Sequence, residues 1–448
     1  MRVAQQDRTW SPVAEGYAAG LFLAYVFFLF LHSAPPSLTN YADWTYQGIL
    51  LKELLLGHSD LWHRLKPYPV PNSTVTIGIG LLSLVLPWVL AAKVWLSVQL
   101  AISFFCLRHL LRTIGSGSAP WIILPQAAFL NVSFWYGFMN FDFGLCWVLL
   151  IASLLLRQLR AHKQTWIDEV GIGGVLLLAF FTHMIPFAFA ALLVVLYAVQ
   201  TRRWRIIWPL LPSMLLTLWY VLGRYMVSEN ADAAIGLVPT ARAYSGMFWA
   251  TKLHALLKSF GFVNLVTADH SIDIALWGRT LFVLLILANL LLCAILSWRM
   301  IAAFLKADRS ATPDRFLWTA ILLVIPVYLL VPGAALGVSD PGSRVLQVAL
   351  CVGLILGVSQ WSDCSLRRIT FLCSGILGIA GVYLFNAVAM TPQNISGRGM
   401  ILPAAIIGFA QVPVYDQDRY YRALESGDRR LAVFPTGMFV NTNLKPLR

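Results

Sequence analysis

The run GVLLLAFFTHMIPFAFAALLVVLYAV, residues 174–199, is apolar except for a short break around Thr182, His183 and Pro186. The stretches on either side of the break, residues 168–183 and 184–200, approach the roughly 20 residues that a helix needs to cross a bilayer. This part of the sequence therefore predicts two consecutive membrane-spanning helices with a polar turn between them.

The pattern recurs along most of the 448-residue chain, which is 59% hydrophobic and only 12% charged. Soluble domains are about 25% charged, so the bilayer must be the solvent for most of this surface. We predict an all-α polytopic membrane protein of about eleven transmembrane helices, in which residues 74–113 fit either one pass or two. The other predicted spans are residues 16–34, 118–136, 139–158, 206–225, 272–297, 315–335, 343–361 and 367–390.

The formal net charge of +13 comes largely from short basic clusters at the ends of the apolar runs. Such clusters set membrane orientation and contact anionic lipid, so we predict membrane lipids and no nucleic acid as partners. The basic clusters, predicted to be cytoplasmic, are residues 108–112, 157–163, 202–205, 299–309 and 367–368.

This orientation places outside the cytoplasm loop 35–73, the turns around Asn140 and His183, loop 226–271, the turn 336–344 and a short tail, 391–448, that follows the transmembrane domain 1–390. Two full passes within 74–113 would break the scheme, so one half of that segment is expected to be re-entrant or interfacial. In the tail we predict a short amphipathic helix near 416–422 and a strand near 431–435. The tail either covers the active cleft as a lid or caps the outer face. We predict a multi-pass protein of the bacterial inner membrane, with its active side periplasmic.

The first outer loop holds the most promising carboxylate. Asn40 is a predicted N-cap and Gly57 a predicted C-cap for a helix over 43–56 that is apolar enough to lie in the interface. Asp43, in its first turn, is placed to accept a proton from an incoming hydroxyl as a general base. The simpler interpretation is an acidic first-turn residue that the helix dipole favours.

Basic and aromatic residues follow within the same loop. Arg64 and Lys66 could hold a phosphate and stabilise the charge that grows as it leaves, or else contact lipid headgroups. Aromatic rings stack on sugars or form the interfacial belt; the candidates are Tyr46, Trp62 and Tyr68. We predict no metal site, because His58 and His63 match no standard ligand spacing; the alternative is a bound divalent cation.

Three further candidates lie at polar breaks between apolar runs. Asn140 and His183 either line a site or make structural turns, because polar groups inside membrane segments are expensive unless they face protein or water. Arg344 either binds a phosphate from the start of a late span or pairs locally with Asp340.

The layout resembles the GT-C superfamily of polytopic membrane glycosyltransferases. The resemblance rests on Tyr41-Ala-Asp43-Trp-Thr-Tyr46-Gln47, on Lys66-Pro-Tyr68-Pro69, and on the breaks at 135–140 and 182–186. It implies a polyprenyl-phosphate-linked sugar donor, a glycan, lipid or protein acceptor, and a first-loop carboxylate, here Asp43, that deprotonates the acceptor. Many members carry a pair of acidic residues, whereas Asp43 stands alone until Glu53, which argues against a metal-dependent version. The chain has no phosphate-binding loop or dinucleotide fingerprint, as expected for a lipid-linked donor.

Other functions stay open from the sequence. An O-antigen polymerase or ligase would rely on the basic residues of loop 226–271. A transporter or flippase would place ionisable residues and repeats around a midplane site. The chain could also be a non-catalytic subunit of a polysaccharide assembly complex. The basic loop residues are Arg242, Lys252, His254, Lys258 and His270.

Overall fold

The computed structural model is mostly helical. It describes residues 12–31, 40–58, 63–114, 132–135, 137–161, 165–227, 249, 252, 276–306, 315–331, 334–335, 338–339, 341–359, 369, 372–373, 375–376, 417–431 and 438–441. Its helices are α1 (Pro12–Leu31), α2 (Tyr41–Leu55), α3 (Thr74–Leu82), α4 (Trp88–Ile114), α6 (Val132–Trp135), α7 (Met139–Ala161), α8 (Trp166–Thr182), α9 (Met184–Thr201), η2 (Trp204–Leu210), α10 (Leu211–Val227), α13 (Leu276–Lys306), α14 (Arg315–Leu330), α15 (Pro341–Ser359) and α17 (Gln417–Ser426). The short strands are β1 (His63–Leu65), β2 (Ala334–Ala335), β3 (Val338–Ser339) and β4 (Phe439–Asn441).

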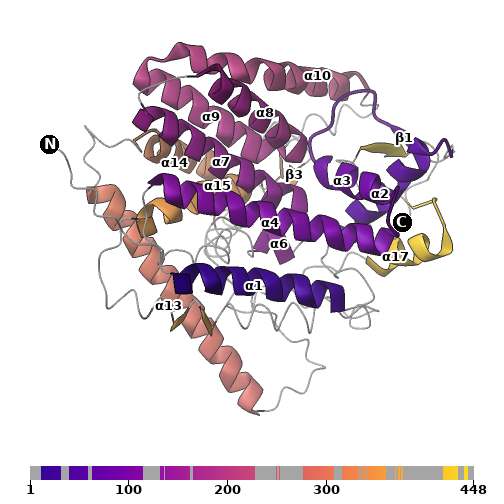
Figure 1. The fold of residues 1–448 in the computed structure, drawn as a ribbon, viewed down its shortest axis with the longest axis horizontal. Helices are drawn as coiled ribbons and strands as arrows, with labels where there is room; N and C mark the ends of the chain where they lie inside the picture. The colour runs from indigo at the N-terminus through magenta and orange to yellow at the C-terminus, as the bar shows by residue number, and fades with distance from the viewer. Residues whose placement is uncertain are drawn as a thin grey trace.

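The bundle is organised around α7. From top to bottom of Figure 1, α10, α8, α9, α7, α4 and α1 follow one another, and α14 and α15 pack against α9. Most residues of α7 are buried on all sides of the helix, as expected for a helix at the centre of a bundle. Gly144 lets α9 approach closely, because a Cβ at this position would lie 2.6 Å from the Cγ of Pro186.

The helices are those of a multi-pass membrane protein. Four stretches of the described chain are long and apolar enough to cross a bilayer: α4, α7, α9 and the combined η2–α10 segment Trp204–Arg224. The outer face of α10 exposes Leu211, Leu215, Leu218 and Leu222, and residues three or four apart share one side of a helix. A stripe of this kind suits lipid. Predicted span 118–136 and predicted span 367–390 lie largely outside the described residues.

The ambiguous segment 74–113 contains one long helix and one short one. The nine residues of α3 extend only about 14 Å, too short to cross a bilayer core of about 30 Å. The 27 residues of α4 extend about 40 Å. The geometry therefore allows one pass, by α4, and removes the difficulty that two passes posed for orientation.

The basic clusters at the ends of α4, α7 and α9 lie at one end of the bundle. Arg157 pairs with Asp168 at 2.5 Å, and Arg205 pairs with Glu169 at 3.0 Å, so the start of α8 joins two clusters. Arg160 donates to the carbonyl of Ile114 at the end of α4, at 3.1 Å. This arrangement agrees with the predicted placement of these clusters on one side of a membrane.

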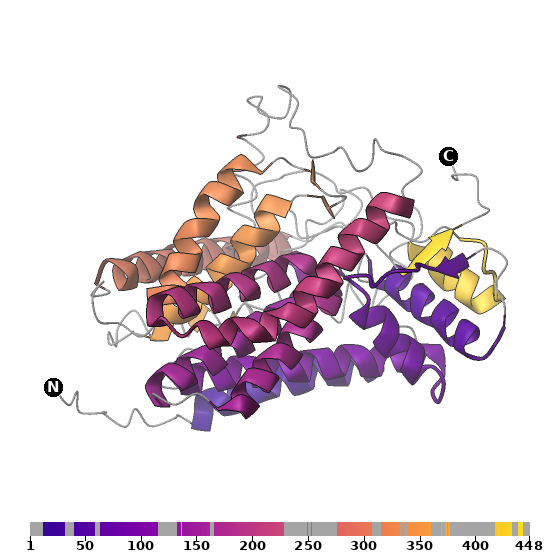
Figure 2. The same ribbon diagram turned by 90° about the horizontal axis from the view of Figure 1, so that it is seen from above.

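The other end of the bundle carries α2, α3, β1 and the C-terminal tail. Figures 1 and 2 both show α17 and β4 beside α2 and β1, although they are far apart in sequence. Strands β1 and β4 pair antiparallel, with Arg64 opposite Val440. The amphipathic tail helix is confirmed as α17. The predicted strand near 431–435 is wrong at Leu431, which is irregular, and the residues after it lie outside the described part; the described tail strand is β4.

The predicted helix of the first loop is confirmed as α2, and Asn40 occupies the predicted N-cap position. Asn40 precedes the helix in an α conformation and makes no side-chain capping bond, because a capping side chain needs an extended backbone to reach the first amides. Gly57, at φ +79°, follows the last turn, where glycine adopts the left-handed conformation without a Cβ penalty.

Candidate active site

Asp43 is buried in the first turn of α2. Only 1% of the residue is exposed, and one carboxylate oxygen accepts a hydrogen bond of 2.8 Å from Gln47, one turn further along the helix. The hydroxyl of Tyr420 in α17 lies close enough to the carboxylate for the charge of Asp43 to act on it. We call Asp43, Gln47 and Tyr420 the carboxylate cluster. Burial, followed by the charge of Asp43, raises the pKa of Tyr420, so this hydroxyl keeps its proton and donates.

The C-terminal tail is fixed to α2 by several independent contacts. The Tyr46 hydroxyl donates to the carbonyl of Asp428 at 3.1 Å, and its ring lies 5.6 Å from that of Tyr420. Arg429 pairs with Glu53 at 3.0 Å. Buried His63 contacts the carbonyl of Leu431 at 2.9 Å. The described tail is therefore part of the wall around Asp43.

A second group, which we call the loop cluster, contains Lys66, Tyr68, Tyr220 and Arg224. The rings of Tyr68 and Tyr220 meet edge to face at 5.9 Å, and Arg224 donates to the Tyr220 hydroxyl at 3.0 Å. Burial, and then the positive charge of Arg224, lower the pKa of Lys66 to about 8. The charge of Arg224 therefore acts on Lys66, and an anion bound near both would stabilise their charged forms.

A third group, the cation cluster, joins residues 161 positions apart. Arg344, at the start of α15, lies with Nη1 3.1 Å from Nε2 of His183. Its guanidinium also stacks over the ring of Phe138 at 4.2 Å and faces Phe141 at 5.9 Å. His183 is the break between α8 and α9, and it has an extended backbone.

The hydrogen bonds of His183 depend on which of its ring nitrogens carries the proton. Nδ1 accepts from the backbone N–H of Ile185 at 3.1 Å, and a neutral imidazole has only one accepting nitrogen. In the tautomer that makes this bond, Nε2 carries the proton and lies beside the guanidinium of Arg344 as a second donor; in the other tautomer, Nε2 accepts from Arg344. Two adjacent donors are best satisfied by one anionic oxygen that accepts from both.

Asn140 ties these groups to the same end of the bundle. Its side-chain oxygen accepts from the backbone of Val75 at 3.1 Å, and its amide donates to the carbonyl of Asn72 at 3.0 Å. The same loop meets the end of α8, where the backbone N–H of Ser73 donates to the carbonyl of Phe181 at 2.9 Å. The entry to α3 thus connects the loop cluster to the cation cluster.

The predicted site residues fall into different surroundings. Asp43, Lys66, Tyr68, His183 and Arg344 lie in the three clusters; Tyr46 holds the tail, Asn140 holds the loop, and Arg64 is exposed on β1. Trp62 and Asp340 lie outside the described residues, so the predicted pair between Asp340 and Arg344 does too.

Sequence reasoning missed three contributors: Gln47, Tyr420 and Arg224. Gln47 carried a signal, because it lies four residues after Asp43 on one helix face. The other two reach their partners only through tertiary folding. In the part of the chain that the structure describes, no group of three histidine, cysteine or acidic residues could hold a metal ion.

Most of the basic loop 226–271 lies outside the described residues, and Lys252 is its one described cation. The ammonium of Lys252 donates to the carbonyl of Val331 at 2.7 Å and lies 4.9 Å from the centre of the Tyr328 ring. It therefore stabilises the end of α14, close to the start of α15.

Comparisons with known proteins found one solved structure to report. The fold is similar to that of ArnT from Cupriavidus metallidurans, bound to undecaprenyl phosphate, with a TM-score of 0.47 and 13% identity. The match covers 84% of this chain and 76% of the other. No family model and no curated protein matches the chain.

Proposed function

We propose that this chain is a glycosyltransferase of the bacterial inner membrane, with its site on the periplasmic side. It would move a sugar from a polyprenyl phosphate to a hydroxyl of a glycan, lipid or protein acceptor. The observation that carries this proposal is the buried carboxylate of Asp43 at the bundle end that also holds two separate cationic clusters. One group accepts a proton, and the others balance the charge of a leaving phosphate.

In the proposed reaction Asp43 takes the proton of the acceptor hydroxyl as the acceptor oxygen attacks the anomeric carbon. The bond between that carbon and the phosphate oxygen breaks, and polyprenyl phosphate leaves with the bonding electrons. The negative charge that grows on the phosphate is stabilised by fixed donors in a water-poor site. The loop cluster and the cation cluster each present such donors, from Lys66 and Arg224 and from His183 and Arg344.

The test is transfer of labelled sugar by the full chain in membranes supplied with polyprenyl-phosphate sugars. Loss of a general base lowers turnover by roughly 10²–10⁴-fold, so Asp43→Asn should lower the rate on that scale at equal protein level. A matched control is Asp428→Asn, which changes a tail carboxylate that pairs locally with Arg430 at 3.0 Å.

Transfer that survives in Asp43→Asn would remove Asp43 as the base and direct attention to the polymerase or ligase interpretation. Absence of transfer by the wild-type chain with every donor would favour a transporter or a non-catalytic subunit.

A further inference from the structure

The tail residue Tyr420 is placed to act on Asp43. It is 3% exposed, and its ring packs against Tyr46, which lies three residues after Asp43 in α2. Its hydroxyl lies close enough to the Asp43 carboxylate for the charge of that carboxylate to raise the pKa of Tyr420. Gln47 donates a hydrogen bond to one carboxylate oxygen from within α2, so Asp43 has neighbouring groups from both its own helix and the tail.

A third side chain extends this arrangement. Arg419 donates from Nη2 to the Tyr420 hydroxyl oxygen at 3.1 Å, and its guanidinium lies 4.9 Å from the centre of the same ring. A hydroxyl that accepts a bond from a cation becomes a stronger donor, because hydrogen bonds in a chain polarise one another. Arg419 therefore donates to Tyr420, and the hydroxyl proton of Tyr420 can point toward Asp43.

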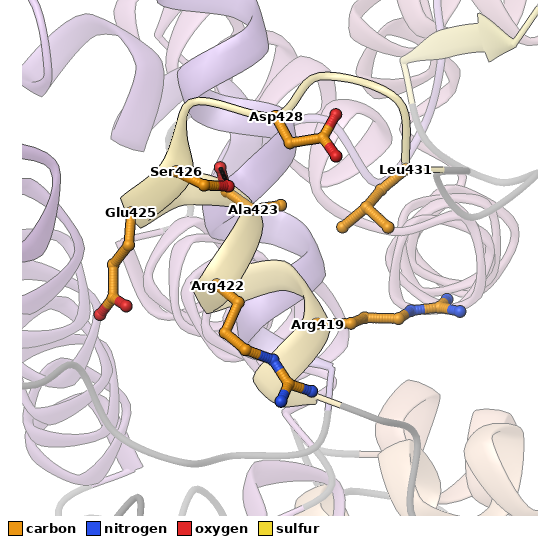
Figure 3. A pocket seen from close by; sticks show the side chains of 7 residues that line it. All are labelled: Arg419, Arg422, Ala423, Glu425, Ser426, Asp428 and Leu431. Carbon is orange, nitrogen blue, oxygen red and sulfur yellow. Dashed lines mark hydrogen bonds between the residues drawn. The ribbon is translucent and has the colours of Figure 1, made fainter.

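Arg419, at the far end of this series of hydrogen-bonding side chains, lines an open cavity of about 590 Å³ on α17. Figure 3 shows Arg419 and Arg422 projecting from one end of the helix, away from Ser426 and Asp428 at the other end. Arg419 is thus partly accessible, whereas Tyr420 and Asp43 are buried. From the cavity inward, the guanidinium of Arg419 is followed by the hydroxyl of Tyr420 and then by the carboxylate of Asp43.

We infer that Tyr420 is a positioning residue for the proposed reaction, which holds Asp43 in its charged, proton-accepting form with support from Arg419. The inference rests on the proposed role of Asp43. It makes the C-terminal tail a working part of the active site rather than a cap. Because a hydrogen bond to a carboxylate favours its charged form, losing the hydroxyl should make Asp43 hold its proton to higher pH.

The experiment is the pH profile of sugar transfer by Tyr420→Phe, which keeps the ring and removes the hydroxyl. We expect the acidic limb of the profile to move up by about one pH unit, with a lower rate below neutrality. The control is Tyr421→Phe, because the ring of Tyr421 stacks on Trp88 at 6.0 Å. This control should leave the limb where it is in the wild type.

A structural role alone would lower the rate of Tyr420→Phe equally at every pH, and a limb that coincides with the control overturns the inference. If Tyr420→Phe fails to accumulate, Arg419→Gln takes its place and should move the limb in the same direction by less. An unmoved limb there overturns the inference as well. Failure of the proposed function is distinguishable, because Asp43→Asn would then retain transfer or the wild-type chain would show none.

Discussion

The carboxylate cluster and the cation cluster lie at the same end of the bundle but are built in different ways. Asp43 accepts a hydrogen bond from its own helix, and the neighbouring Tyr46 donates to the tail 382 residues away. Arg344 and His183 instead stand at the ends of bundle helices, where the guanidinium rests on the ring of Phe138.

This difference separates the two tasks of the proposed transfer. Hydrogen-bond donors around a carboxylate tune when it holds a proton, whereas adjacent donors on a rigid scaffold stabilise a departing anion. Changes at the carboxylate cluster should therefore alter the pH profile, and changes at the cation cluster should alter the use of the donor.

Among the substitutions that test this difference between the two clusters, Arg344→Gln is expected to have the largest effect on turnover. The substitution removes a fixed cation from a site in which His183 remains as a lone donor. Loss of one such donor lowers turnover by about 10²–10³-fold. Initial rates at several donor concentrations should show this loss, with the position of the acidic limb unchanged.

Arg344→Lys is the matched variant, because it keeps the charge and loses the planar fork that lies over Phe138. We expect it to recover part of the rate. Normal rates in Arg344→Gln, at equal folded protein, would show that the cation cluster is structural and would leave the loop cluster as the anion site.

The same two clusters show how much of the fold and of the site can be predicted from the sequence. The apolar runs fixed the helices, and Asp43, His183 and Arg344 were all recognised as unusual for their positions. Their neighbours were not. Arg344 had an obvious local candidate in Asp340, whereas its described polar contact is His183, on the break between two other helices. Local spacing predicts partners within an element, but contacts between elements depend on how the helices pack.

The tail shows the same limit more clearly. Its residues predict a short amphipathic helix, and α17 is that helix. Nothing in the spacing of Tyr420 indicates that it meets Asp43, because the contact arises only when β4 pairs with β1 and the tail docks on α2. The choice between a lid and a cap could not be made from composition, since both present an apolar face to the protein.

A smaller effect is predicted for the pH dependence of polyprenyl phosphate binding at the loop cluster. Because the pKa of Lys66 is lowered to about 8 by burial and by Arg224, its ammonium is charged below that pH and becomes neutral above it. Binding of a polyprenyl phosphate should therefore weaken as pH rises through about 8, by up to roughly tenfold. Titration of the full chain in detergent with the phosphate lipid at several pH values measures this.

Lys66→Arg provides the matched comparison, because arginine keeps its charge throughout this range. Its affinity should show no step near pH 8. A step of equal size in Lys66→Arg would assign the pH dependence to another group and remove Lys66 from the anion site.

The smallest effect is expected where the tail is held to α2. Burial tends to raise the pKa of Glu53, but the His58 hydrogen bond and the charges of Arg429 and Lys52 hold it below its ordinary value. Glu53 therefore stabilises the docked tail above that ordinary value, and the contribution is lost as pH falls through the lowered pKa. Glu53→Gln should weaken docking at neutral pH by about 0.5–1 kcal/mol, as for a partly exposed ion pair.

Limited trypsin digestion of the full chain measures this docking, because Arg429 and Arg430 are cleavage sites beside Glu53. Cleavage there should be a few-fold faster in Glu53→Gln than in Glu425→Gln, which changes an exposed glutamate on α17. Because the tail supplies Tyr420, Glu53→Gln should also move the acidic limb slightly in the direction of Tyr420→Phe. Equal digestion of both variants would show that the hydrogen bonds of Tyr46 and the pairing of β1 with β4 hold the tail without this ion pair.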